Sequence, residues 1–409
     1  MKNNKLLFIV LALIVASGLF SSAKFFKSFN LISVAKNMAA VFFVDSITAN
    51  DLKNTYNSAG LGGEKFKILI VPGHYVDSGG ALYRNLKEAD LNLAVATQLS
   101  EFLKSDNRLE VIMVKNESGI NSDIENYYLN HKKEIADFVT KQKSEMSEFV
   151  GNGLLKKVSS VEHRRAPDET ALRLYGVNKW ASENKIGVVI HIHFNDYPRR
   201  RQTSEGDYTG FSVYIPEKQY SNAKASRAVA EKVFDQLDNF YPKSDYPKEN
   251  VGLVEDQELI AVGSFNSIDS AAFLIEYAYI YESQLKNPKI RESLLKELAL
   301  QTYIGLENFF GGIVNFGGAH QTFLVPYSFN KSLTKGEENS LAVLSLQTAL
   351  LLDGVYPPLG KTKYDCPLTG NFRECTLASV KQFQQKYDIT GGNGFVGAKT
   401  REKLNALFF

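Results

Sequence analysis

Cysteine is scarce in this sequence, and neither sign of charge is in clear excess. The 409 residues include 47 lysines and arginines and 45 aspartates and glutamates, which gives a formal net charge of +2. The chain therefore lacks both the basic field that attracts nucleic acid and an acidic tail, so its partners have to be inferred from individual sites. Its two cysteines, Cys366 and Cys375, lie close together near the C-terminus, which favours one local disulfide over a metal cluster.

Other absences exclude further classes of protein. The G-x-S-x-G nucleophile elbow does not occur, which argues against a serine hydrolase. "GVYPPLGKT" at residues 354–362 looks like a phosphate-binding loop, but five residues rather than four separate its glycines, and its two prolines remove amides that phosphates need. With 44% apolar and 22% charged residues, the composition is that of an ordinary globular protein. The chain is long enough for a catalytic core and a smaller module.

The N-terminus has the layout of an export signal. Lys2 and Lys5 precede an apolar run over residues 6–19, and small residues follow it. We predict a signal peptide or a membrane anchor over residues 1–23. The run is short for a membrane span, which needs ~20 residues, so cleavage and anchoring through residues 6–20 are both retained as alternatives. In either case the protein is expected outside the cytoplasm, where it is secreted, periplasmic or associated with the cell wall.

The rest of the chain divides into a larger α/β domain and a smaller helical one. Residues 24–65 are predicted to be a linker, because the later part of this segment is polar and contains glycine. Apolar runs and stretches of helical period then alternate, which predicts a mostly parallel, twisted sheet with helices on both faces over residues 66–311. The runs lie at residues 66–71, 108–114, 187–194, 210–216 and 271–280, and the helical stretches include 87–103, 223–237 and 290–310.

The C-terminal residues 336–409 are predicted to form a small all-α module, after a second linker at residues 312–335 that is rich in Gly, Asn and Ser. Three short helical stretches are joined by glycine-rich turns: "SLAVLSLQTALLLDG", "TLASVKQFQQKYDI" and "GFVGAKTREKLNALF". Four apolar residues at helical spacing are the expected core of this module rather than ligand contacts: Leu344, Val380, Phe383 and Leu404.

Two polar residues stand near the end of the first predicted strand. In "ILIVPGHYVDSGG", Pro72 and Gly73 end a buried strand, so His74 is presented at the carboxyl end of that strand. Open parallel sheets place their ligand sites at these carboxyl ends. Glu88 lies in the first turn of the helix that follows, and we expect it on the same side of the sheet.

Later strands carry further candidates. Alternate side chains of a strand share a face, so in "VVIHIHFND" the side chains of His191, His193 and Asn195 point the same way. Two histidines on one face of an apolar strand are unusual. In "FLIEYAYI", Glu276 is a carboxylate within a strongly apolar strand, where burial is costly unless a cation or hydrogen bonds compensate.

Two histidine nitrogens and one carboxylate form a standard catalytic zinc set that leaves a position for water, and a second carboxylate then takes the proton of that water. Each residue also has a purely structural interpretation. His74 would cap a turn, Glu88 would be favoured by the helix dipole, the strand histidines would be a core pair, and Glu276 would be held by an arginine such as Arg84. The expected convergence of the four residues at one sheet edge favours the metal site.

Five segments resemble, in order and spacing, the zinc-dependent N-acetylmuramoyl-L-alanine amidases of bacterial cell-wall turnover: "KILIVPGH", "KEADLNLAVATQLSEFL", "EVIMV", "HFN" and "FLIEYAYIYES". The resemblance covers about residues 66–310. It implies that Glu276 is the catalytic base and that three residues bind zinc: His74, Glu88 and His193.

The two other polar residues of the histidine strand are expected beside the zinc ligands rather than on the metal. His191 lies one pleated step, about 6 to 7 Å, deeper in the sheet than His193. We expect His191 to hydrogen-bond a ligand or a backbone carbonyl and so to orient the site. Asn195 is assigned to the same surrounding shell of residues.

The sequence departs from the family pattern in three places without losing a proposed ligand. Tyr75 replaces a second glycine, Val114-Lys115 replaces Thr-Arg, and His191 replaces the usual serine. A polar segment at residues 150–176 also precedes the histidine strand. It has two interpretations: a regulatory helix that covers the zinc, as family members can carry, and a solvated helix pair beside the substrate groove.

The "VKQFQQKY" helix of the last seventy residues resembles the three-helix peptidoglycan-binding module. The resemblances imply a zinc hydrolase that binds peptidoglycan and cleaves the amide between N-acetylmuramic acid and L-alanine. The N-terminal signal predicts that it is exported, and we expect it to be a monomer. Two alternatives are retained: a noncatalytic peptidoglycan-binding protein, which would not need a buried Glu276, and a zinc peptidase that cuts wall peptides. No nucleic-acid partner is expected.

Overall fold

The structure is a computed structural model that describes residues 45–74, 80–158, 161, 166–196, 200–263 and 270–409. Residues 1–44, which include the predicted signal or anchor and part of the first predicted linker, lie outside the described residues, and so does Tyr75. Among the helices of the described residues, none is both long enough and apolar enough to cross a membrane.

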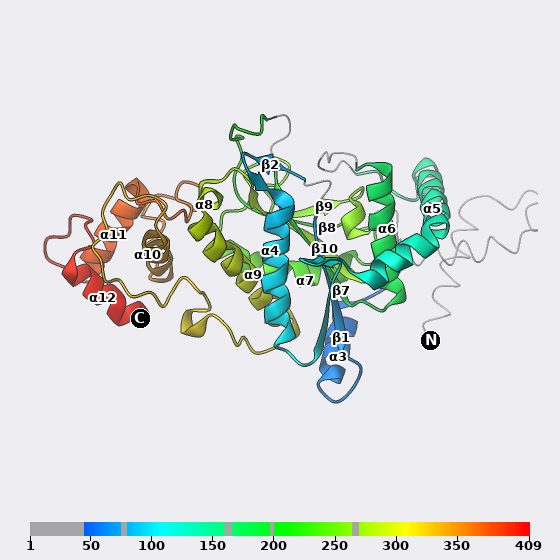
Figure 1. Ribbon diagram of the computed structural model, residues 1–409, viewed down its shortest axis with the longest axis horizontal. Coiled ribbons are helices and arrows are strands. Elements are labelled where there is room, and N and C mark those ends of the chain that lie inside the picture. The colour runs from blue at the N-terminus through cyan, green and yellow to red at the C-terminus, as the bar shows by residue number, and fades with distance from the viewer. Residues whose placement is uncertain (1–44, 75–79, 159–160, 162–165, 197–199, 264–269) are drawn as a thin grey trace, which may run out of the picture.

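A six-stranded sheet lies at the centre of the larger domain, with the strand order β4-β1-β7-β10-β8-β9 (Figure 1). Neighbouring strands are parallel except for β10 and β8, which are antiparallel. The predicted mostly parallel sheet is confirmed. Each predicted apolar run overlaps one of its strands, whereas β9 lies outside all of the predicted runs. The strands are β1 (Phe66–Pro72), β4 (Leu109–Met113), β7 (Val188–Asn195), β8 (Ser212–Pro216), β9 (Leu253–Asp256) and β10 (Ala271–Tyr279).

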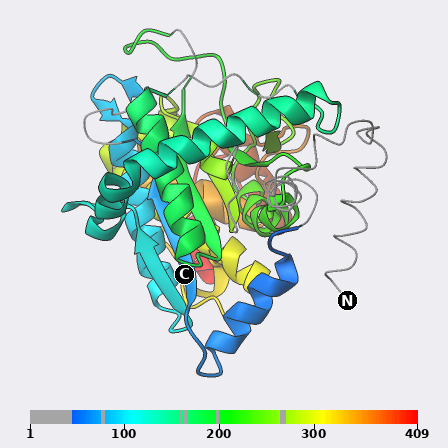
Figure 2. The same ribbon diagram turned by 90° about the vertical axis from the view of Figure 1, so that its right-hand side faces the viewer.

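Helices cover both faces of this sheet, as predicted (Figures 1 and 2). The domain contains α3 (Ala49–Ala59), α4 (Glu88–Lys104), α5 (Ser122–Gly151), α6 (Asp168–Glu183), α7 (Ala223–Asp238), α8 (Ser283–Lys286) and α9 (Pro288–Phe310). α4, α7 and α9 pack on one face, and α5 packs with α6 on the other. The short elements are β2 (Leu82–Tyr83), β3 (Leu86–Lys87), β5 (Lys115–Asn116), β6 (Gly119–Ile120) and two 3₁₀ turns, Ile260–Val262 and Gly318–His320.

Burial on both faces explains why the central strands are apolar at nearly every position. On β1, Ile68 and Ile70 belong to the hydrophobic cluster that contains α4 and α9. Leu69 and Val71 point the other way and pack with Trp180 of α6. Parallel strands covered in this way read as continuous hydrophobic runs. Polar side chains can therefore avoid the free-energy penalty of burial mainly at the strand ends.

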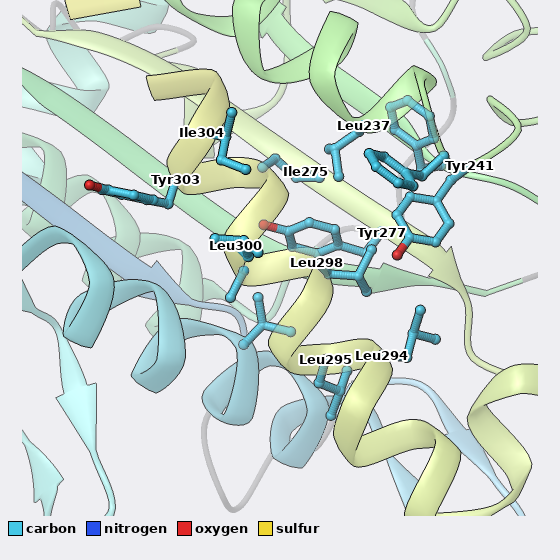
Figure 3. Close-up of a cluster of buried hydrophobic side chains, with 14 of the residues drawn as sticks. Leu237, Tyr241, Ile275, Tyr277, Leu294, Leu295, Leu298, Leu300, Tyr303 and Ile304 are labelled. Atoms are coloured by element: carbon cyan, nitrogen blue, oxygen red, sulfur yellow. The ribbon is translucent and has the colours of Figure 1, made fainter. Parts of the chain in front are cut away.

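α9 is the long helix that anchors the core (Figure 3). The side chain of Asn287 caps its start by accepting hydrogen bonds from two backbone N–H groups, and the helix ends at Gly311, whose φ of 77° is left-handed. Figure 3 shows Leu298 and other apolar side chains of this helix gathered against Ile275 and Tyr277 of β10. Each fully buried leucine of this kind contributes roughly 1.5–3 kcal/mol to stability.

The prediction of a linker over residues 24–65 is wrong where α3 forms. Thr48 and Asp51 make a capping box at the start of this helix. Leu52 and Tyr56, one helical turn apart, are only 1% and 0% exposed and belong to the main hydrophobic cluster. The segment is polar overall, so composition concealed the two apolar residues that fix the helix to the domain.

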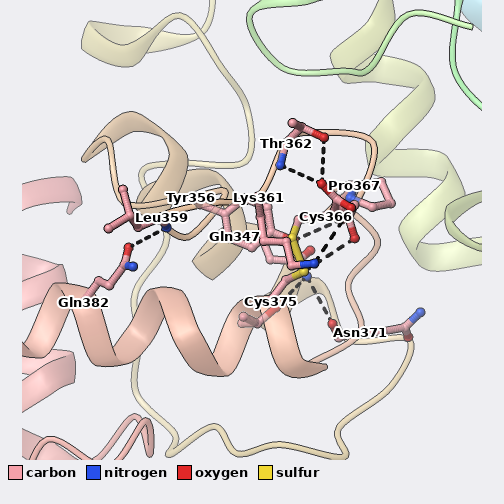
Figure 4. The surroundings of a disulfide bond; sticks show 12 residues. Gln347, Tyr356, Leu359, Lys361, Thr362, Cys366, Pro367, Asn371, Cys375 and Gln382 are labelled. Atoms are coloured by element: carbon pink, nitrogen blue, oxygen red, sulfur yellow. Dashed lines mark hydrogen bonds and ion pairs between the residues drawn. A yellow bond between two sulfur atoms is a disulfide. The ribbon is translucent and has the colours of Figure 1, made fainter. Parts of the chain in front are cut away.

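The C-terminal part contains the three predicted helices, α10 (Leu341–Leu352), α11 (Glu374–Lys386) and α12 (Ala398–Phe408). The predicted disulfide between Cys366 and Cys375 is present and joins the loop after α10 to the first turn of α11 (Figure 4). The four predicted core residues are all 0% exposed: Leu344, Val380, Phe383 and Leu404.

The C-terminal helices pack directly on the α/β domain, at the end of the molecule away from α5 (Figure 1). Lys363 donates hydrogen bonds to the backbone carbonyl and to Oδ1 of Asp238, just after the middle of the chain. Gly370 approaches α9 so closely that an added Cβ would lie 2.5 Å from Cδ1 of Ile290. The buried residues of both parts form one continuous hydrophobic cluster, so the C-terminal helices are fixed in place rather than loosely tethered.

A buried carboxyl group lies near the start of β1. Glu307 of α9 is 1% exposed, and neither of its carboxylate oxygens has a hydrogen-bond partner among the described residues. Close by, Tyr56 donates a hydrogen bond to Asp106, which also accepts hydrogen bonds from Arg108. Burial and the negative charge of Asp106 raise the pKa of Glu307 to about 7, against the opposing effect of Arg108.

We expect Glu307→Gln to be more stable than the wild type at pH 8. Because the pKa is raised in the folded state, this group stabilises the fold fully below its ordinary value of 4.5, and that stability is lost as the pH rises through about 7. Glutamine cannot ionise, so the variant should avoid a loss on the order of 3 kcal/mol. Urea unfolding at pH 5 and pH 8 measures this, with the exposed Glu402→Gln as the control. Equal pH dependence in wild type and Glu307→Gln would contradict the prediction.

Candidate metal centre

The three side chains predicted to bind zinc meet at the carboxyl ends of β1 and β7. Nε2 of His74 lies 3.1 Å from Oε2 of Glu88, and Nδ1 of His193 lies 3.0 Å from Oε1 of the same carboxylate. One donor atom from each residue can be chosen so that all three lie within 4.8 Å of one another. Two imidazole nitrogens and one carboxylate oxygen are a donor set that suits zinc and leaves a position for water. The residues present therefore fit the metal.

Two glycines make room for this cluster. The backbone N–H of Gly73 donates to the carbonyl of Ile192, and a Cβ at position 73 would lie 2.2 Å from Cε1 of His193. Gly80 has a φ of +70°, and a Cβ there would lie 2.3 Å from Oε2 of Glu88. His74 itself has a φ of 58°, in the left-handed region that residues other than glycine rarely adopt. The chain thus accepts a strained turn in order to bring the donors together.

Two buried side chains donate hydrogen bonds to the backbone carbonyls of this turn. Asn92, one helical turn after Glu88, donates from Nδ2 to the carbonyl of Gly73 at 3.1 Å and to Oε1 of Glu88 at 3.4 Å. Lys115 donates from Nζ to the carbonyl of Gly73 at 3.2 Å and to the carbonyl of His74. The sequence reasoning did not assign a role to either residue. Asn92 could have been found from its spacing, because it lies four residues after Glu88 on the same helix. Lys115 lies on a different element, β5, so no such spacing relates it to Glu88.

The electrostatics favour the ligand forms of these residues. Burial opposes ionisation of Glu88, but hydrogen bonds with His193 and His74 outweigh it and lower the pKa of this carboxyl group. Burial also lowers the pKa of His193, against the opposing effect of Glu88. An ionised carboxylate and a neutral imidazole are the forms that bind metal ions.

Glu276 lies directly beside this cluster. On the adjacent parallel strand it is the register partner of His193. Its Oε2 is buried and has no hydrogen-bond partner among the described residues, and no ion pair joins Arg84 to it there. Burial and the negative charges of Glu88 and Glu249 raise the pKa of Glu276 well above its ordinary value. A carboxyl group of this kind, next to three metal donors, is suited to taking up a proton.

His191 does not make the predicted contact through Nε2. This residue is 1% exposed, and its Nε2 has no hydrogen-bond partner among the described residues. Burial lowers the pKa of His191 to about 3, so the ring is neutral at physiological pH. Its register partners on the two adjacent strands are the apolar residues Val71 and Leu274. His191 therefore lies in an apolar environment, two residues before the candidate ligand His193 on the same strand.

Asn195 contacts Glu249 rather than a candidate ligand, which corrects its predicted place around the metal. Its Nδ2 donates to both carboxylate oxygens of Glu249, at 3.0 and 3.1 Å, and its Oδ1 accepts from the backbone N–H of Asp196. The sequence reasoning missed Glu249, because it stands in a polar loop without any periodic pattern. Only the fold brings this loop to the edge of the sheet.

The polar segment at residues 150–176 includes the end of α5, the connection to α6 and the first nine residues of α6, and the two helices pack against each other. Leu155 is buried with Phe149 and Met146 of α5. The backbone N–H of Val158 donates to the side chain of Gln257. Residues 159–160 and 162–165, which fall in this segment, lie outside the described residues.

Comparison with known proteins identifies the family. Residues 68–307 match the N-acetylmuramoyl-L-alanine amidase family. The chain belongs to this amidase family. The matched range is more than half of the chain, and it ends before the C-terminal helices. It includes the four residues of the candidate site: His74, Glu88, His193 and Glu276.

Several solved amidase structures are similar to the chain at low identity. The amidase from Clostridium difficile 630 is 16% identical, over 61% of this chain and 98% of that chain, with a TM-score of 0.37. AmiC2 of Nostoc punctiforme is 15% identical, over 61% and 98%, with a TM-score of 0.36. The catalytic domain of CwlV from Bacillus (Paenibacillus) polymyxa var. colistinus is 16% identical, over 61% and 99%, with a TM-score of 0.37. No curated protein matches the chain.

We expect Gly73→Ala to weaken Zn²⁺ binding by about ten-fold or more, because the new Cβ would push the His193 ring away from Glu88. Calorimetric titration of Zn²⁺ into the purified protein measures the change. Gly151→Ala is the matched control, since a Cβ at that helical position meets no atom within 4 Å. Equal Zn²⁺ affinity in Gly73→Ala and wild type would show that this contact does not matter for the site.

Proposed function

We propose that the protein is an exported zinc hydrolase that cleaves the amide bond between N-acetylmuramic acid and L-alanine in peptidoglycan. The observation that carries the proposal is the meeting of three metal donors, His74, Glu88 and His193, beside Glu276, whose Oε2 has no partner among the described residues. Membership of the amidase family supports the substrate class. A binding protein without catalysis would gain nothing from this buried carboxyl group, whose desolvation is costly.

In this proposal His74, Glu88 and His193 hold a Zn²⁺ ion. When bound, the ion polarises the carbonyl of the scissile amide and increases the acidity of water at the site. Asn92 and Lys115 support the site by holding the turn that carries His74. The four donor and base residues all come from one chain, so a monomer is sufficient for the reaction.

Glu276 moves the proton. Its Oε2 accepts a proton from the attacking water as the water oxygen adds to the amide carbonyl carbon. The same oxygen then delivers the proton to the amide nitrogen, and the carbon–nitrogen bond breaks. The products are the carboxylate of the lactyl group and the free amino group of L-alanine. The raised pKa of the Glu276 carboxyl group makes it a better proton acceptor than an ordinary exposed glutamate.

We also propose that residues 336–409 bind peptidoglycan and that residues 1–23 direct export of the protein. The compact three-helix arrangement of α10, α11 and α12 and the "VKQFQQKY" sequence of α11 support the first proposal. The disulfide between Cys366 and Cys375 supports the second, because such bonds persist in oxidising compartments. The location outside the cytoplasm is also where the substrate lies.

Digestion of purified peptidoglycan, followed by mass spectrometry of the soluble fragments, tests the function. We expect stem peptides that begin with a free L-alanine, and we expect a chelator of Zn²⁺ to prevent their release. Cuts confined to bonds inside the stem peptide would indicate a zinc peptidase instead. Binding to intact peptidoglycan without any cut would indicate a noncatalytic binding protein.

In the same assay, Glu276→Gln should lower turnover by about a hundred-fold or more, because glutamine keeps the shape of the side chain but cannot accept the proton. The Zn²⁺ content should stay at the wild-type level. Glu258→Gln, which changes a half-exposed carboxylate, is the control and should keep wild-type turnover. Near-wild-type turnover of Glu276→Gln would mean that another group is the base.

The two strand histidines should differ in their effect on the metal. We expect His193→Ala to lose stoichiometric Zn²⁺, because it removes a donor atom. His191→Ser restores the residue usual in the family and should retain the ion, since Nε2 of His191 bonds to no described residue. Measuring the Zn²⁺ content of both purified variants by mass spectrometry shows which of the two histidines binds the ion. Zn²⁺ lost from His191→Ser and retained in His193→Ala would reverse the assignment.

A further inference from the structure

Glu249 joins three neighbouring strands at the edge of the sheet where the candidate site lies. It is 3% exposed and stands in the loop between α7 and β9. Its Oε1 accepts hydrogen bonds from Nδ2 of Asn195 at 3.0 Å and from Oη of Tyr214 at 2.5 Å. Its Oε2 accepts from Nδ2 of Asn195 at 3.1 Å and from Oη of Tyr279 at 3.1 Å. The donors come from β7, β8 and β10, so one carboxylate connects all three strands.

Two of these donors follow the proposed catalytic residues along the chain. Asn195 comes two residues after His193, and Tyr279 comes three residues after Glu276. His193 and Glu276 are register partners, and so are Asn195 and Tyr279. β10 therefore has one more residue than β7 in this interval, which is a β-bulge. A bulge bends its strand and changes the direction of the side chains beside it, so the direction of Glu276 depends on how the bulge is held.

The bulge is fixed by the backbone and by Glu249. The backbone N–H of Ile280 donates to the carbonyl of Asn195 at 2.9 Å, which closes the ladder beyond the bulge. Glu249 adds a side-chain link between Asn195 and Tyr279, the pair that follows the bulge. Without this carboxylate, the buried donor groups would lose an acceptor, which is unfavourable. The strand ends would then move to find new partners.

We infer that Glu249 is a positioning residue, which fixes the distance between Glu276 and His193 by joining the ends of β7 and β10. The inference rests on the proposed function, because that proposal assigns the base and the metal ligand. A misplacement of about 1 Å between catalytic groups costs about a hundred-fold in rate. Glu249 acts through the two strands and does not touch the substrate in this role.

Two variants and one matched control test the inference. Glu249→Gln keeps the shape of the side chain but replaces an acceptor oxygen with an NH₂ group, which faces other donors. It also removes the negative charge that raises the pKa of Glu276, whereas the second variant leaves that charge in place. Tyr279→Phe removes one hydroxyl group and keeps the ring. Tyr277→Phe is the control: it lies on the same strand, it is 2% exposed, and its hydroxyl is 2.6 Å from that of Thr302, away from Glu249.

With peptidoglycan as substrate, Glu249→Gln and Tyr279→Phe should lower kcat by about ten-fold or more, while KM and the Zn²⁺ content stay within about two-fold of wild type. Tyr277→Phe should lower the melting temperature, since it loses a buried hydrogen bond, but keep kcat within about two-fold. If kcat is the same in Glu249→Gln and Tyr277→Phe, the inference is overturned. A loss confined to KM or to the Zn²⁺ content would overturn it as well.

Crystal structures of wild type and Glu249→Gln separate this inference from the proposed function. We expect the distance between the Glu276 carboxylate and the His193 ring to change by about 0.5–1 Å in the variant. Wild-type protein that releases no stem peptides would reject the proposed function, and the two structures would still decide the positioning role. An unchanged distance would overturn the inference even in an active enzyme. If Glu249→Gln does not fold, Tyr279→Phe serves for the same measurements.

Discussion

The candidate site depends on one buried carboxylate, that of Glu88. It is 4% exposed, and it interacts with both candidate histidines and accepts a hydrogen bond from the backbone N–H of Ala81 at 2.8 Å. A charge buried this deeply is strongly unfavourable unless several partners compensate. The position of Glu88 in the first turn of α4, where the helix dipole favours a negative charge, supplies part of the compensation. The backbone N–H of Ala81 and the two imidazoles supply the rest. The absence of a side chain at Gly73 and at Gly80 lets these groups approach one another.

The sheet decides where such an arrangement is possible. Its central strands are buried on both faces by apolar clusters. Polar side chains from different strands can therefore gather only at the strand ends, outside the hydrophobic core. Glu276 lies where the apolar part of its strand ends, and its Oε2 has no hydrogen-bond partner in the described part of the chain. An unsatisfied buried carboxyl group lowers stability. At Glu276 the adjacent metal donors provide a requirement other than stability that accounts for the residue.

The features predicted correctly from the sequence are those encoded by a few adjacent residues. Apolar runs located the strands, and the Pro-Gly turn placed His74 at a strand end. The alternation of side chains placed His191 and His193 on one face, and the family resemblance was needed to choose His193. The residues that were missed act over long distances in the chain. Glu249 reaches the site from a polar loop with no periodic pattern. Lys115 follows the apolar run at residues 108–114, but only the fold shows that its side chain reaches the carbonyls of Gly73 and His74. The contact between Asn195 and Glu249 was not predicted, for the same reason. α3 was missed because its apolar surface consists of few residues.

Glu276 and Glu307 show that a perturbed carboxyl group does not by itself identify an active site. In both groups burial is the largest cause of a raised pKa, and a neighbouring carboxylate adds to it. Around Glu307, however, the interacting charged groups are Asp106 and Arg108, so this pKa affects only the stability of the fold. Glu276 differs in its geometry, because its strand neighbour is His193, whose ring shares a carboxylate with a second imidazole. Desolvation supplies the affinity for a proton, and the adjacent donor set supplies a reaction in which that proton can be used.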